Sequence, residues 1–157
     1  MEGTNTIDII EHRIMDDFQA EIPEHFEKVG DKYYYFDQDQ EAHNWFGAVE
    51  KCRQIDGHLI NPQNENELLQ VASKLSSSQE YWTDLNNLVN KTLFYSLTTG
   101  RVANMLNDDS NSDVNMCGLI RFDPSNSSYR LTKHNCFQKK NFICETTQPT
   151  TISFLLW

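Results

Sequence analysis

Four cysteines constrain the fold of this chain more than any other feature of its sequence. They are Cys52, Cys117, Cys136 and Cys144, and an even number of cysteines in a small domain is typical of two disulfides. Zinc sites usually take cysteines in close pairs, whereas seven residues separate Cys136 from Cys144, the closest pair here. Disulfides indicate an oxidising compartment. Cysteine spacing alone leaves three ways of pairing the four residues.

Composition limits the number of domains and the class of partner. The 157 residues, 38 % apolar and 11 % aromatic, suit a single core, because two domains would each bury too little surface. A net charge of −10 repels phosphate backbones and anionic membranes, so nucleic acid is excluded as a partner. The same charge attracts cations such as calcium, and it also simply keeps a protein soluble. No segment approaches the roughly 18 apolar residues of a membrane span.

The two ends of the chain differ from its middle. Residues 1–25 form an acidic extension in which apolar side chains recur at helical spacing, and these are Ile7, Ile10, Ile14, Phe18 and Ile22. This stripe predicts a short neck helix that joins chains into an oligomer, or a helix that lies on its own domain. Residues 146–157 form a tail that adds an edge strand or hangs free.

The predicted location is secreted or extracellular. The polar start, Met1 to Thr6, is not followed by the apolar run of a secretory leader, so we expect the leader to be missing from this sequence. Two sequons, at Asn90 and Asn126, are predicted glycosylation sites in that compartment.

Residues 26–145 are predicted to be one α+β unit. An aromatic strand, Lys32 to Phe36, is followed by a helix over residues 43–55 with Asn44 as its N-cap and Gly57 at its end. A second helix is predicted to begin near Asn61-Pro62, a capping residue before a proline. Its apolar stripe is Leu68, Ala72 and Leu75. Short apolar runs then indicate antiparallel strands at residues 81–82, 93–97, 117–122, 128–131 and 142–144.

Four motifs in this unit resemble the C-type lectin-like domain. Residues 44–52 are similar to the family's first helix, and Gly57-His58-Leu59 to the exit from it. Residues 81–85 stand where the family carries its WIGL motif, of which Trp82 and Leu85 match. Residues 141–145 are similar to the closing strand. The resemblance implies two helices packed on two small, mainly antiparallel sheets with a long polar loop. It also implies disulfides Cys52–Cys144 and Cys117–Cys136.

In sugar-binding members of this family, calcium sits in the long loop and coordinates the sugar. Such a site needs a cluster of hard oxygen ligands. Aligned on Cys117, the ligand triplet falls on residues 107–109, but no proline lies between Pro62 and Pro124, and the acid before the cysteine becomes Asn115. Before Cys136, Lys133 stands where the family has a carboxylate. A second loop site maps to Asn87 and Lys91, again without acids.

The resemblance therefore implies a ligand-binding loop whose usual calcium ligands are not intact. The candidate ligand-binding residues are Asn107, Asp108, Asp109, Asn111, Asp113, Asn115, Thr132 and Lys133. The weak metal candidates are Asp109 and Asp113 in the loop, and Glu65 with Glu145 at a separate structural site. Alternating oxygens from Asp109 onward resemble the start of an EF-hand loop but lack its glycine and closing glutamate.

Two functions from different classes remain open from the sequence. The first is glycan recognition through the long-loop face with weak or no dependence on calcium. The second is recognition of a protein or glycoprotein by the same fold, with no sugar or calcium site. An enzyme is not predicted, because none of the five histidines lies in a metalloprotease motif, and no nucleophile elbow or phosphate-binding loop occurs.

Overall fold

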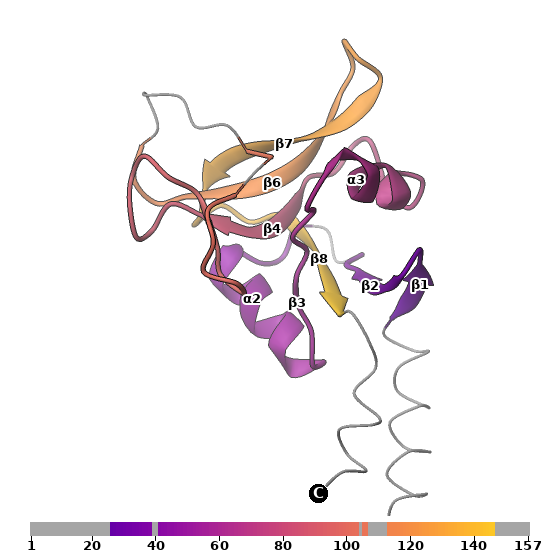
Figure 1. The fold of residues 1–157 in the computed structure, drawn as a ribbon, viewed down its shortest axis with the longest axis horizontal. Helices are drawn as coiled ribbons and strands as arrows, with labels where there is room; N and C mark the ends of the chain where they lie inside the picture. Colours follow the sequence, from indigo (N-terminus) through magenta and orange to yellow (C-terminus); the bar gives the residue numbers. More distant parts are fainter. Residues whose placement is uncertain (1–25, 39–40, 104, 107–112, 147–157) are drawn as a thin grey trace, which may run out of the picture.

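The structure, a computed structural model, describes residues 26–38, 41–103, 105–106 and 113–146 (Figure 1). Two helices and eight strands follow one another along this part of the chain. They are β1 (Glu27–Val29), β2 (Lys32–Phe36), α2 (Trp45–Gln54), β3 (His58–Leu59), α3 (Glu65–Ala72), β4 (Tyr81–Asn86), β5 (Tyr95–Ser96), β6 (Met116–Asp123), β7 (Ser128–Asn135) and β8 (Asn141–Thr146). The predicted α+β class is confirmed.

The strands form one connected sheet in the order β1-β2-β8-β4-β6-β7, with β3 on β8 and β5 on β4. Two antiparallel groups meet where β4 runs parallel to β8, with Tyr81 beside Asn141 and Trp82 beside Phe142. The two small sheets expected from the family are therefore joined along this parallel pair. All residues of β4 and β8 are buried, because both faces of the sheet are covered at its centre.

Neighbouring residues of the central strands enter different cores, as the alternation of side chains along a strand requires. Tyr81 and Ile120 belong to the core that includes Leu68 and Val71 of α3. Trp82 follows Tyr81 in β4, and Leu119 precedes Ile120 in β6. Both Trp82 and Leu119 belong to the core that includes α2 and all four cysteines. The sheet therefore separates two apolar layers, one under each helix (Figure 1).

Helix α2 forms as its sequence predicts. The Asn44 side chain accepts a hydrogen bond from the Gly47 N–H at 2.9 Å, which caps the first turn. Trp45, Ala48 and Cys52 are buried on one face. The predicted role of Gly57 at the helix end is different, because Asp56 takes the left-handed conformation with φ of 63°.

Gly57 is instead required by close packing. A Cβ at this position would lie 3.0 Å from the Glu145 carbonyl oxygen of β8 and 3.0 Å from the Phe26 ring.

The second helix begins later than predicted. Asn64, not Asn61, caps α3, and its side chain accepts a hydrogen bond from the Glu67 N–H at 3.0 Å. The sheet explains the difference, because Ile60 is held in an extended conformation by β8 and β4: its N–H donates to Ile143 and its carbonyl accepts from Asp84. The buried stripe of α3 consists of Leu68 and Val71, so Val71 takes the place predicted for Ala72.

The first and last described strands, β1 and β8, flank β2. Tyr34 of β2 lies opposite Glu27 of β1 on one side and opposite Glu145 of β8 on the other. Thr146, predicted to start the tail, is the last residue of β8. The predictions for residues 1–25 and 147–157 lie outside the described residues.

Candidate functional site

Two disulfides cross-link the described part of the chain. Cys52 of α2 is joined to Cys144 of β8, and Cys117 of β6 to Cys136, which follows β7. This is the pairing that the family resemblance implies. The second disulfide holds the point where the chain returns from the long segment between β4 and β6. The backbone N–H of Cys136 also donates to the Asn115 carbonyl at 2.9 Å.

The structure describes half of the candidate loop residues. Asn107, Asp108, Asp109 and Asn111 lie outside the described residues. Asp113 and Asn115 are exposed and directly precede β6. Asn115 has φ of 59°, a conformation that asparagine tolerates better than most residues. Thr132 and Lys133 lie in β7, opposite Leu119 and Gly118 of β6, so β6 and β7 bring the described candidates to one end of the sheet.

Lys133 rests on an aromatic ring at this face. Its ammonium nitrogen lies 5.9 Å from the centroid of the buried Phe94 ring, within range of a cation–π interaction. Gly118, which pairs with Lys133, packs closely against β4: a Cβ there would lie 3.0 Å from both the Leu85 Cβ and the Thr83 hydroxyl. A positive charge therefore occupies the position that the resemblance gives to a ligand carboxylate.

Asn87 is a clamp within the long loop. Its carboxamide nitrogen donates to the carbonyls of Lys91 at 3.1 Å and Asp113 at 2.7 Å, and its oxygen accepts from the Met116 N–H at 2.8 Å. The side chain is buried, and these bonds tie the beginning of the loop to its end. Sequence reasoning considered Asn87 only as a metal ligand. An asparagine directly after a buried strand is the signal that favours such a clamp.

Glu145 of β8 is the centre of a second polar group. Its Oε1 lies 3.8 Å from the Lys32 ammonium, and its Oε2 lies 3.8 Å from His58 Nδ1. Lys32 is closer to Glu67, at 3.4 Å. Burial outweighs the nearby Lys32 cation and a hydrogen bond from the Asn61 N–H, and it raises the pKa of Glu145 to about 8.

Glu65 and Glu145, the two candidates for a separate structural calcium site, lie in different surroundings. Glu65 is exposed in the first turn of α3, and Glu67 is the acid of that helix that shares Lys32 with Glu145. Lys32 was missed because it lies on β2, far from both acids in the sequence.

The described residues do not fit calcium at the family's usual positions. Lys133 contributes a cation, and the Asn87 oxygen is already used by a backbone N–H. Within the described ranges no three acidic, histidine or cysteine side chains are grouped as a metal site would require.

The fold and the site match one protein family. The family model described as the lectin C-type domain matches residues 41–146. This chain belongs to the C-type lectin domain family. The family resemblance is thereby confirmed, and the domain has a recognition fold.

Curated relatives come from fruit flies. The accessory gland protein Acp29AB of Drosophila melanogaster is 34 % identical over 127 residues, which cover 78 % of this chain and 51 % of that protein. C-type lectin 37Db of the same species is 30 % identical over 121 residues, covering 75 % of this chain and 79 % of that one. The chain thus spans about half the length of Acp29AB.

Solved structures share the fold at low identity. The C-type lectin domain of murine dendritic cell inhibitory receptor 2, solved in complex with N-glycan, has a TM-score of 0.67 at 17 % identity and covers 78 % of this chain and 96 % of that one. Human lithostathine has a TM-score of 0.66 at 19 % identity, with 80 % and 90 % covered. No described helix is long and apolar enough to cross a membrane.

Proposed function

We propose that this C-type lectin domain binds glycan through its long-loop face without needing calcium. The observation that carries the proposal is the Lys133 ammonium of β7 over the Phe94 ring. An ammonium group donates hydrogen bonds to sugar hydroxyls directly, whereas it repels a metal ion at the same position. The structural neighbour solved with an N-glycan supports glycan as the ligand class.

The site of action in this proposal is extracellular. Two buried disulfides persist only in an oxidising compartment, and the sequons at Asn90 and Asn126 both lie on exposed turns. In this proposal residues 26–145 form the domain that acts there.

Protein recognition is the second candidate, and one surface favours it. Phe46 of α2 and Phe137 after the second disulfide are 41 % and 57 % exposed, with their ring centroids 5.4 Å apart. Trp45 packs edge-on against Phe46 from below, which holds the pair in place. Exposed, rigid aromatic pairs are typical anchors of protein interfaces.

A glycan array probed with and without a chelator tests the first proposal. We expect the domain to bind, and binding to survive the chelator. Lys133→Met keeps the contact with Phe94 but removes the charge, and we expect it to weaken binding by about tenfold or more, the size of a lost charge-assisted hydrogen bond. Lys51→Met, an exposed change on α2, is the matched control and leaves binding unchanged.

The outcomes separate the alternatives. Binding that disappears with the chelator would contradict calcium independence. Absence of glycan binding, together with capture of a protein partner that Phe137→Ser abolishes, would favour protein recognition instead.

We also infer that Asn90 and Asn126 carry N-linked glycans when the chain passes through the secretory pathway. In the folded protein Asn90 is exposed and its side-chain oxygen accepts from the Thr92 hydroxyl at 2.9 Å. Asn126 lies in the turn between β6 and β7. Mass spectrometry before and after glycosidase treatment is expected to show a mass loss that Asn90→Gln and Asn126→Gln each reduce. An unchanged mass in the wild type would refute this inference.

A further inference from the structure

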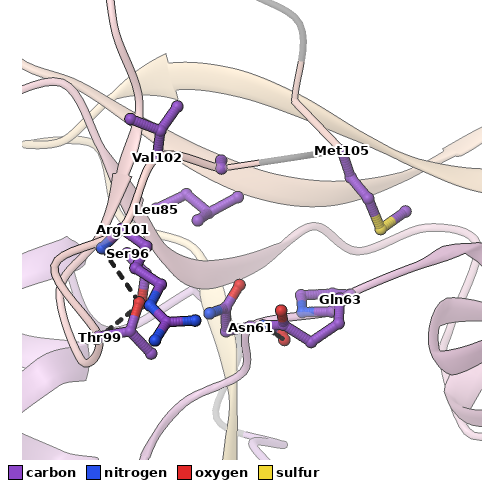
Figure 2. A pocket seen from close by; sticks show the side chains of 10 residues that line it. Asn61, Gln63, Leu85, Ser96, Thr99, Arg101, Val102 and Met105 are labelled. Carbon is purple, nitrogen blue, oxygen red and sulfur yellow. Dashed lines mark hydrogen bonds between the residues drawn. The ribbon is translucent and has the colours of Figure 1, made fainter.

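A pocket of about 400 Å³ lies between the long segment that joins β4 to β6 and the segment that joins β3 to α3. One wall is the segment between β3 and α3, and the other is the hairpin that contains β5, with Leu85 of β4 between them (Figure 2). The volume lies within the usual range of small-molecule sites, roughly 300–1,000 Å³. Asp113, Asn115, Thr132 and Lys133 do not line it.

The first wall presents the carboxamide of Asn61. This residue is only 8 % exposed, and it is one of the residues that line the pocket. Its carboxamide points into the pocket (Figure 2). Because Asn64 caps α3 instead, the Asn61 side chain is not used by the helix. A carboxamide carries both donors and an acceptor, so it can pair with the hydroxyls of a ligand.

Asn61 is also fixed in position by its backbone. Its N–H donates to the buried Glu145 carboxyl, and its carbonyl accepts from the Gln63 side chain at 3.2 Å. The amide therefore presents a donor and an acceptor at a defined place rather than moving with a loop.

The second wall supplies a cation. Arg101, on the other wall, also lines the pocket (Figure 2). Its backbone is held by two bonds, since the Arg101 carbonyl accepts from the Ser96 N–H at 2.8 Å and its N–H donates to the Thr99 hydroxyl at 3.1 Å. Among the described residues no carboxylate pairs with Arg101, in a chain whose net charge is −10. Arg101 is also the one charged residue among those that line the pocket.

We propose that this pocket binds a sugar residue that carries a carboxylate, such as a uronic acid. The guanidinium of Arg101 takes the carboxylate, because its planar set of donors matches that group in a bidentate contact. The Asn61 amide and the Thr99 hydroxyl pair with ring hydroxyls. Apolar carbons of Leu85, Val102 and Met105 cover the C–H face of the ring.

The pocket shares no lining residue with the loop site proposed above. A failure of either proposal is therefore distinguishable from a failure of the other. The mixed lining favours a sugar acid over its rivals. A plain anion leaves the apolar side of the pocket uncovered, and a neutral sugar leaves Arg101 unpaired.

The test titrates the full chain with glucuronate and follows the amide spectrum of the isotope-labelled protein. We expect saturable shifts at residues that line the pocket, and at least tenfold weaker binding of glucose, which matches glucuronate in size but lacks its charge. Arg101→Gln is expected to weaken glucuronate binding about tenfold to a hundredfold. Arg101 is exposed, and its side chain makes no hydrogen bond with another described residue, so we expect the variant to fold.

Two controls make the result specific. Arg130→Gln makes the same change of charge on β7 outside the pocket and should leave binding unchanged. Asn61→Ala removes only the amide. It should weaken glucuronate binding and should not strengthen the binding of glucose. Absence of glucuronate binding, equal binding of glucose, or glucuronate binding that Arg101→Gln leaves intact would each overturn the proposal. Tighter binding of the acidic dipeptide glycylaspartate would overturn the sugar assignment and identify a peptide site.

Discussion

Replacing Cys52 and Cys144 together by alanine is expected to lower the free energy of unfolding by about 4–5 kcal/mol. The two residues are separated by 92 positions, and a cross-link over so long a loop removes much of the conformational freedom of the unfolded chain. The disulfide also joins α2 to β8, the strand that pairs with β4 where the two halves of the sheet meet. Urea unfolding under non-reducing conditions measures the loss.

Replacing Cys117 and Cys136 is the matched control. Their separation is 19, so the expected loss is smaller, about 3 kcal/mol. Both pairs are fully buried in the same core, which makes the packing lost by the two double variants similar. A larger loss from the shorter loop would show that strain or local packing, not loop length, decides how each disulfide stabilises the fold.

The stability of the domain is expected to fall between about pH 5 and pH 8 because of Glu145. Burial raises the pKa of this carboxyl from 4.5 to about 8. Between these values the folded chain keeps a proton that the unfolded chain has lost, so rising pH favours unfolding, by a few kcal/mol over the whole interval. The groups that face Glu145 are Lys32 of β2, His58 of β3, Glu67 of α3 and Asp84 of β4.

Asp84 adds to the effect in the same direction. It is buried, which raises its pKa, although hydrogen bonds from Ser96 and Thr98 oppose the rise. One of its oxygens has no hydrogen-bond partner within the described residues.

Glu145→Gln isolates the contribution of Glu145. The variant keeps the shape of the side chain but cannot ionise, so we expect it to be more stable than the wild type near pH 8 and to lose that advantage near pH 5. Thermal unfolding at both pH values measures the difference. A difference that does not change with pH would refute the assignment.

Glu80→Gln provides a control with the opposite sign. Partial burial alone would raise the pKa of Glu80, but ion pairs with Lys140 and Arg121 lower it. Its charge therefore stabilises the fold at neutral pH, and that stabilisation is lost as the pH falls through the lowered pKa. Glu80→Gln should thus be less stable than the wild type at neutral pH and approach it in acid.

Local signals in the sequence predicted the elements well because each acts over a few residues. The Asn44 cap, the aromatic strand β2 and the closing strand β8 depend on short-range hydrogen bonds and on alternation. The start of α3 was predicted at the wrong asparagine because two of them, Asn61 and Asn64, precede the helix. The choice between them is made by strands β4 and β8, which hold Ile60 extended and which no local pattern reveals.

The functional surfaces were harder to predict for the same reason. Aligning the chain on Cys117 and Cys136 placed Lys133 correctly near the loop, because β6 and β7 are neighbours in sequence and in space. The environments of Glu145 and Asn61 depend on contacts from β2, α3 and the β5 hairpin, which lie far apart along the chain. The spacing of residues in the sequence gives no information about such long-range contacts until the fold is known.

The first and last described strands flank β2, and this affects how the domain can be displayed. Both β1 and β8 belong to the half of the sheet that lies away from β6 and β7, so the described chain begins and ends away from β7 (Figure 1). A domain attached through its β1 and β8 side leaves its β6 and β7 side accessible to large ligands. If several copies were attached side by side through β1 and β8, their binding faces would point the same way. A ligand with repeated units would then bind to several copies at once, with a higher overall affinity than to a single copy.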